Sequence, residues 1–305
     1  MIQLQAQAPQ AGPGYGQARS WPAHLRLRLE ADPFPAGGKT LPEGKASEGG
    51  KTRLKGLDFA GPLRIQRPFY PEGGTCHLYL LHPPGGLVSG DRLAIEVAAE
   101  PGSQVLLTTP SAGKIYGRDS AGVAQGQQVW LRAGEGAELE WLPQETIVYR
   151  GANGVLDTKV ELAEGARFIG WDLVCLGRPA GEHWFEQGHL TQRLQLHRGG
   201  RLLFNERLSL EGGDWLHRGR VGLNGGCVFG TLMAAGPGLD DALIGELREA
   251  LPGPDFTLTE RLGVLLVRYL GTDMNNCRDG MWRAWGLIRP AVLGRPAVIP
   301  RIWLT

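Results

Sequence analysis

Five carboxylates are the residues of this sequence best placed to do chemistry. Asp172 lies in the apolar run FIGWDLVCL, and Glu206 lies in LLFNERLSL. Glu140 and Glu145 occur close together around the segment WLPQ, and Asp91 ends a loop rich in proline and glycine. Burying an ionised carboxylate in an apolar strand is costly unless the group is paired or hydrated. These acids therefore need partners, which makes them the first candidates for a functional role.

Two arrangements would satisfy such acids. In the first, each acid pairs with an arginine such as Arg178, Arg193 or Arg207, which is the commoner fate of buried carboxylates. In the second, Asp172 and Glu206 come near one another and line a wet internal passage. The residues alone leave both arrangements open.

Several familiar catalytic and ligand-binding motifs are absent. The loop LLHPPGGLVSGDRL (80–93) has glycines at the spacing of a phosphate-binding loop, but Asp91 and Arg92 follow where lysine and a hydroxyl are needed. No zinc-type pairing of Cys and His occurs, nor a Gly-x-Ser-x-Gly elbow. The segment SAGKIYG (111–117) contains Ser, Lys and Tyr, and we interpret it as a polar loop that contacts a partner.

Charge and cysteine usage narrow the class of protein. The net charge of +1 gives no support to binding of nucleic acid or of an anionic membrane surface. The sequence contains neither an apolar stretch long enough to span a bilayer nor the pattern of a signal peptide at its start. The four cysteines are far apart and form no Cys-x-x-Cys pair. We therefore expect a cytoplasmic protein with reduced thiols.

The elements that must position the acids are mainly β-strands. The 305 residues include 47 glycines and 21 prolines, well above average usage, which favours many short strands joined by tight turns. Residues 21–30 alternate apolar and polar side chains and predict a half-buried strand. Residues 1–20 are expected to form a disordered tail, and 31–50 a mobile loop. Residues 21–305 are expected to form one domain, with a β body over about 21–235.

A weak internal repeat suggests how the strands are arranged. Segments beginning near 97, 131, 161 and 196 can be aligned on four glycines, each followed three residues later by an apolar residue. The aligned glycines and apolar residues are Gly102 and Val105, Gly136 and Leu139, Gly165 and Phe168, and Gly200 and Leu203. Such a repeat predicts a β-helix or solenoid-like stack of strands. A recurring strand and glycine turn in an ordinary antiparallel protein is the alternative.

The C-terminal part, about 236–305, is predicted to contain two helices. The first follows an Asp240 cap and stops at Pro252. Residues 262–271 predict a buried strand. The second helix begins at a Thr272/Asp273 cap, carries apolar residues at helical spacing, and is expected to end at Pro290.

Five ordered segments of the chain together resemble the urease accessory protein UreD family, called UreH in some bacteria. The likeness runs from about Trp21 to Thr305. The segments are GPLRIQRPFYPEGGTCHLYLLHPPGGLVSGDRL (61–93), LLTTPSAGKIYG (106–117), LEWLPQETIVYRGAN (139–153), GWDLVCLGRP (170–179) and RPAVLGRPAVIPRIWLT (289–305).

The resemblance implies a non-enzymatic metallochaperone scaffold with a β-helical fold and two helices at one end. Members of this family bind the accessory protein UreF, which recruits the nickel-carrying GTPase UreG. The assembly docks on apo-urease and helps to deliver nickel to its active site, through an internal water-filled tunnel in UreD. The resemblance therefore implies nickel in transit and no tightly bound cofactor.

The resemblance also assigns residues to these roles. The acids that match the tunnel are Asp91, Asp172 and Glu206, together with Glu140 and Glu145. Carboxylates hold nickel weakly compared with clustered nitrogen and sulfur ligands, and a conduit needs sites that an ion can leave.

Within the resembling segments, partner binding is expected at Lys114, Tyr116 and Arg178. Two alternatives remain. One is an assembly module that grips urease and UreF without passing metal. The other is a β-helical carbohydrate-active enzyme that uses paired carboxylates.

Overall fold

The computed structural model describes residues 20–32 and 50–304 of the chain. Nearly all of the expected disordered tail (1–20) and most of the expected loop over 31–50 lie outside the described residues. Within the described ranges, no helix combines the length and the hydropathy needed to cross a membrane.

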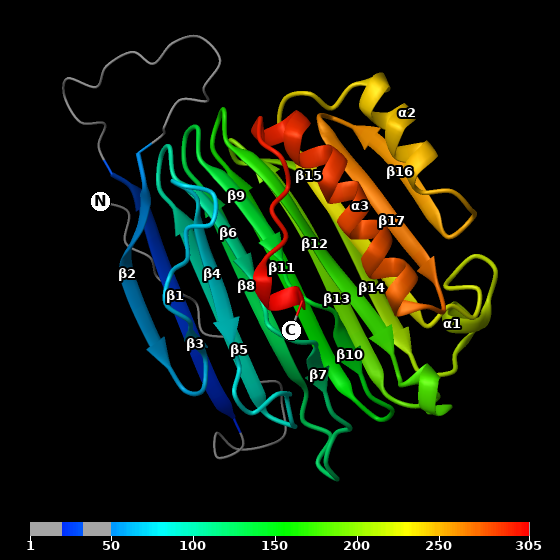
Figure 1. The fold of residues 1–305 in the computed structure, drawn as a ribbon. Helices are drawn as coiled ribbons and strands as arrows, with labels where there is room; N and C mark the ends of the chain where they lie inside the picture. The colour runs from blue at the N-terminus through cyan, green and yellow to red at the C-terminus, as the bar shows by residue number, and fades with distance from the viewer. Residues whose placement is uncertain (1–19, 33–49, 305) are drawn as a thin grey trace, which may run out of the picture.

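Two β-sheets account for most of the described chain (Figure 1). The strands of the first sheet are, in spatial order, β14 (Arg201–Glu211), β13 (His189–Arg198), β11 (Asn153–Leu162), β8 (Gln125–Ala133), β5 (Asp91–Ala99), β1 (Trp21–Ala31) and β2 (Thr52–Ala60). The main path of the second sheet is β16 (Phe256–Arg261), β17 (Val264–Gly271), β15 (Val228–Ala235), β12 (Arg167–Leu176), β9 (Glu138–Leu142), β6 (Gln104–Thr108), β4 (Cys76–Leu81) and β3 (Arg64–Ile65). Beside that path, β10 (Thr146–Val148) pairs with β12 and with β7 (Gly113–Ile115). The prediction of a mainly β protein is confirmed.

The chain alternates between the two sheets along most of its length. Successive strands from β4 to β13 belong by turns to the second and the first sheet, apart from the short β7 and β10. Because every second strand enters the same sheet in the same direction, the neighbours β5, β8, β11 and β13 pair in parallel, as do β4, β6, β9 and β12. Antiparallel pairing occurs toward the sheet ends, for example between β13 and β14.

Three of the four predicted repeats coincide with this alternation. Gly102, Gly136 and Gly165 all have φ between 63° and 71° and sit in the turns that lead from the first sheet to the second. A residue with a Cβ would be strained there, which explains the glycines. The apolar residues that follow them stack in register, with Val105 opposite Leu139 and Leu139 opposite Phe168.

The fourth repeat has a different structure. Gly200 lies in the hairpin between β13 and β14, and both strands belong to the first sheet. The predicted coil therefore does not continue there. The two sheets are open, so the described strands establish a mainly β, two-sheet architecture, while a complete β-helix or solenoid stays a prediction.

One long helix, α3, covers part of the outer face of the second sheet, and α2 packs against α3 (Figure 1). The short α1 (Trp215–Arg218), which was not predicted, follows β14, and α2 (Asp241–Ala250) and α3 (Met274–Leu293) follow later strands. The predicted cap of α2 is confirmed, because Asp240 accepts a hydrogen bond from the amide of Leu243. The predicted strand over 262–271 is β17, but its hairpin partner β16 was missed.

The predicted end of the second helix was wrong. Asp273 caps α3 as expected by accepting bonds from the amides of Asn275 and Asn276. However, Pro290 lies inside the helix, which continues to Leu293 and ends at Gly294, with φ of 71°. The side chains of Val292 and Leu293 are buried, so the extra turn gains apolar burial that offsets the hydrogen bond lost at proline.

Apolar side chains fill the space between the sheets and the space under α3. The alternation predicted for residues 21–30 is confirmed, because Leu25, Leu27 and Leu29 are all buried. The stripe of α3 is also buried, including Met281 and Trp285, and packs against β12, β15 and β17. β12, β15 and β17 of the second sheet are thus covered by α3 on the face turned away from the first sheet.

Candidate functional site

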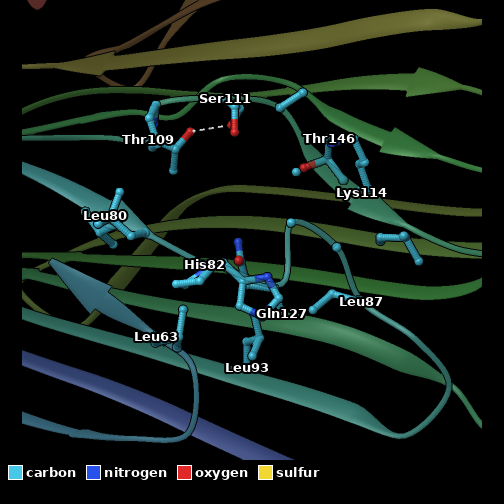
Figure 2. A pocket seen from close by; sticks show the side chains of 18 of the residues that line it. Leu63, Leu80, His82, Leu87, Leu93, Thr109, Ser111, Lys114, Gln127 and Thr146 are labelled. Carbon is cyan, nitrogen blue, oxygen red and sulfur yellow. Dashed lines mark hydrogen bonds between the residues drawn. The ribbon is translucent and has the colours of Figure 1, made fainter. Parts of the chain in front are cut away.

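A cavity of about 370 Å³ lies where three loops or strand ends meet (Figure 2). The turn after β4 contributes His82 and Leu87, the segment after β6 contributes Thr109, and β7 contributes Lys114. Backbone bonds hold the turn in place, since the amide of Leu87 donates to the carbonyl of Lys114 at 2.7 Å. The loop 80–93 is therefore a strand-to-strand turn that forms one wall of a cavity.

Asp91 closes this turn rather than lining the cavity. Its carboxylate accepts a hydrogen bond from the amide of Val88 at 2.9 Å. Burial lowers the pKa of His82, and the charge of Asp91 opposes that shift. Asp91 thus acts electrostatically on His82, which does line the cavity.

Asp172 lies between the two sheets at the next cavity inward. Its carboxylate, on β12, accepts a hydrogen bond of 2.8 Å from the hydroxyl of Thr158 on β11 of the opposite sheet. A longer contact of 3.4 Å comes from the indole nitrogen of Trp141. Burial raises the pKa of Asp172 to about 6, and these hydrogen bonds only partly offset the shift. No arginine pairs with Asp172 in the described structure.

The cavity at Asp172 adjoins the first one. It has a volume of only about 30 Å³, enough for about one water molecule. It shares the lining residues Gln127, Thr146 and Leu156 with the larger cavity near Lys114. Polar side chains from both sheets therefore lead from the loop 80–93 to Asp172.

Glu206 lies on the other side of Asp172 in a third cavity of about 720 Å³. Thr231 links the two acids, because it is the register neighbour of Asp172 on β15 and donates a hydrogen bond to Glu206 at 3.1 Å. The first sheet has a matching link, since Leu156 is the register neighbour of Gln192, which lines the third cavity. Unlike Asp172, Glu206 is paired, with Arg268 at 2.9 Å.

Glu140 and Glu145 lie away from the three cavities described above. Successive residues of a strand point to opposite faces. On β12, Asp172 therefore points to the same face as Phe168, and Ile169 points to the other face. Glu140 on β9 is the register neighbour of Ile169, so its side chain lies on the face opposite to that of Asp172. Glu140 therefore points toward α3, where Trp285 and Arg289 donate hydrogen bonds to it at 2.7 and 3.0 Å.

Glu145 lies in the turn after β9, also near α3. Its nearest cation in the described part is Arg278, at 3.9 Å. One of its oxygens is buried without a hydrogen bond to any described residue. Of the five predicted acids, the structure brings Asp172 and Glu206 together.

A buried network of charges under α3 was not predicted. Arg289 is fully buried and bonds both Glu140 and Glu72. Glu72 also contacts the buried ring of His77 at 2.6 Å, and Arg295 pairs with Glu138 nearby. A sequence signal existed: Arg289 lies four and eight residues after Trp285 and Met281, so it falls on the buried stripe of the helix.

The network gives a prediction for acid stability. Burial would raise the pKa of Glu72, but the hydrogen bonds from His77 and Arg289 outweigh burial and lower the pKa to about 2, from 4.5. A carboxylate with a depressed pKa contributes stability above its unfolded value, and the contribution is lost as pH falls through the folded value. The free energy of unfolding should therefore drop between pH 4.5 and 2.

Urea unfolding of the parent chain and of Glu72→Gln across this range measures the effect. The variant should show a flatter dependence on pH, whereas Glu211→Gln, an exposed acid that contacts His189, should follow the parent. Parallel curves for the parent and Glu72→Gln would contradict the assignment.

Tyr116 and Arg178, two of the residues predicted to bind a partner, both lie beside Tyr149. The rings of Tyr116 and Tyr149 lie 5.1 Å apart, and the guanidinium of Arg178 lies 5.9 Å from the Tyr149 ring. Lys114 lies on β7, and Tyr116 directly follows that strand. Tyr149, which the sequence reasoning missed, is the residue that joins Tyr116 to Arg178.

Tight metal binding has no preformed set of ligands in the described part of the chain. No group of three or more His, Cys, Asp or Glu side chains is arranged there to hold a metal ion. All four cysteines are buried and free, and burial raises the pKa of each thiol. The carboxylates, hydroxyls and amides between the sheets are the remaining oxygen donors.

Comparison with known proteins places the chain in a family. Residues 42–304 match the family model described as UreD urease accessory protein. A urease accessory protein UreD of Marinobacter nauticus is 45% identical over 302 residues, covering 97% of this chain and 96% of the relative. A UreD of Saccharophagus degradans is 46% identical over 262 residues, covering 84% of this chain and 88% of the relative. The chain belongs to the UreD family of urease accessory proteins.

Proposed function

We propose that this chain is a non-enzymatic scaffold for urease maturation. It binds UreF and, through UreF, the nickel-carrying GTPase UreG, and the assembly docks on apo-urease to deliver nickel. Membership of the UreD family supports the urease accessory role. The chain acts in the cytoplasm, without nucleic acid or membrane as a partner.

Nickel passes between the two sheets in this proposal. The observation that carries it is a row of three cavities. The first two share lining residues, and Thr231 links Asp172 at the second to Glu206 at the third. Each cavity offers only a few oxygen ligands, and such ligands hold nickel weakly. An ion can therefore both enter and leave each cavity. Asp172 suits this role because its pKa of about 6 leaves it ionised at neutral pH without an arginine partner.

The remaining predicted residues have supporting roles. Asp91 positions the turn that carries His82 at the first cavity, where we place one mouth of the passage. Glu140 and Glu145 lie toward α3, so a direct metal contact there would need the ion to leave the row between the sheets. Tyr116 and Arg178, joined by Tyr149, and the neighbouring Lys114 form the partner surface. The alternation of sheets supports winding of the body as a β-helix.

An assembly module without metal passage is the second candidate, and one observation favours it. Glu206 is already paired with Arg268, as an acid without a metal role would be. Asp172 lacks such a pair, which favours passage. A carbohydrate-active enzyme would need two acids on an exposed groove, whereas Asp172 and Glu206 both lie between the sheets.

Reconstitution with components left out tests the proposed role. The chain, UreF, UreG and apo-urease are expressed together, and urease activity and bound nickel are measured after purification. We expect omission of this chain to leave urease nearly free of nickel, with restoration when it is supplied again. Full activation without the chain would contradict a role in maturation.

A further inference from the structure

Arg268 on β17 places a positive charge in the third cavity. Its Nε and Nη2 atoms both donate to the same oxygen of Glu206, at 3.0 and 2.9 Å. The other oxygen of Glu206 accepts the hydrogen bond from Thr231. Both oxygens that a cation would need are therefore already in use.

Arg268 is the counter-charge to Glu206 inside this cavity. The charged residues that line it are Glu206, Arg207, Asp255 and Arg268. The Arg207 side chain lies on the outer face of the first sheet, because Arg207 is the register neighbour of the exposed Arg193. A guanidinium stays protonated at every ordinary pH, so Arg268 cancels the charge of Glu206 under all conditions. Without Arg268 the cavity would carry a larger net negative charge and attract a divalent cation more strongly.

The ion pair between Arg268 and Glu206 can open and re-form. The side chains of Arg268 and Glu206 are 35% and 33% exposed, so water screens their attraction. The guanidinium also lies 5.7 Å from the ring centroid of Phe204, on the strand that carries Glu206. If Arg268 leaves the carboxylate, the ring offers it a second resting contact.

We propose that Arg268 is a tethered counter-cation, which occupies Glu206 when no metal is present and which a divalent cation must displace. This inference rests on the proposed passage of metal between the sheets. The exchange keeps Glu206 from becoming a permanent metal site, because the guanidinium competes for the carboxylate as long as the ion remains. Arg268 thereby shortens the stay of the ion at this point.

Titration of the full chain with Ni²⁺ tests the displacement. Isothermal titration calorimetry at neutral pH should show that Arg268→Gln binds Ni²⁺ about tenfold more tightly than the parent, since one competing charge is removed. The double variant Glu206→Gln/Arg268→Gln should lose this gain. Arg207→Gln removes a positive charge from the residue next to Glu206, on the opposite face of β14, without freeing Glu206, and it should change the affinity much less.

Three results would overturn the proposal: equal affinity of Arg268→Gln and the parent, a gain that survives Glu206→Gln, or an equal gain in Arg207→Gln. Circular dichroism verifies the fold, and Arg268→Met, which keeps an apolar stem beside Phe204, replaces the glutamine variant if that one fails to fold.

A separate readout tests the passage itself. Normal nickel content in urease matured with Glu206→Gln would contradict passage at Glu206. Lowered nickel content, combined with unchanged Ni²⁺ affinity in Arg268→Gln, would contradict only the role of Arg268.

Discussion

Urease matured with the double variant Asp172→Asn/Glu206→Gln is expected to contain about tenfold less nickel, while the accessory complex still assembles. The two substitutions keep side-chain size and remove the negative charges between the sheets. A single charge contact in a partly screened interior is worth roughly 1–4 kcal/mol, so losing two is enough for an effect of this size. Nickel per urease active site, measured by atomic emission, is the readout, and co-purification verifies assembly.

Asp172→Asn also carries an internal test of its environment. Burial raises the pKa of Asp172 to about 6, so the folded protein favours the protonated carboxyl over the ionised one. The stability that this gives is present at low pH and is lost as the pH rises through 6. The variant should therefore melt at a higher temperature than the parent at pH 8, and the difference should vanish near pH 4. A loss of nickel transfer in a stabilised protein cannot be attributed to unfolding.

The matched control for the double variant is Asp58→Asn/Glu211→Gln. Both residues are exposed acids of the first sheet that contact histidines, and neither lines the cavities described above. Urease matured with this control should contain normal nickel. If the double variant at Asp172 and Glu206 also gives normal nickel, the passage between the sheets is wrong, although membership of the UreD family is unaffected.

Arg289→Met is expected to lower the free energy of unfolding by about 3–5 kcal/mol, the usual cost of removing one partner from a buried charge network. The substitution leaves Glu140, which is fully buried, and Glu72, which is nearly so, without their shared cation. Methionine fits an apolar helix stripe, so lost packing is a minor part of the effect. Urea unfolding at neutral pH measures the change.

Arg278→Met is the matched control on the same helix. Arg278 is partly exposed and lies 3.9 Å from Glu145, so its removal should cost less than about 1 kcal/mol. Adding Glu140→Gln to Arg289→Met should recover part of the lost stability, because one unpaired charge is then removed. Equal effects of Arg289→Met and Arg278→Met would contradict the importance of the buried network.

Local patterns predicted the elements of this fold better than their arrangement. Leu25, Leu27 and Leu29 alternate with polar residues, and the strand they predict is present with that face buried. The glycines at 102, 136 and 165 marked real turns between sheets, because backbone geometry requires glycine there. Gly200 has the same local pattern but lies in a hairpin within one sheet. That difference depends on pairing across the whole sheet, which a local pattern does not contain.

The candidate site was predictable only where strand periodicity was informative. An approach of Asp172 to Glu206 was one of the two arrangements that the residues left open, and Thr231 does link them. Glu140 belongs to the opposite face, which depends on the register between β9 and β12. The pairing of Arg268 with Glu206 joins residues 62 positions apart, and no spacing rule connects them.

The link between Arg289 and Glu72 has a consequence for biosynthesis. These two residues are separated by 217 positions, so a ribosome adding 5–20 residues per second exposes the acid roughly 10–40 seconds before its cation is made. During that interval Glu72 and, once it is made, Glu140 lack Arg289, the cation that they share in the folded protein. The sheet beneath them is left uncapped until α3 emerges, which makes this a period in which a molecular chaperone would protect the unfinished protein from aggregation.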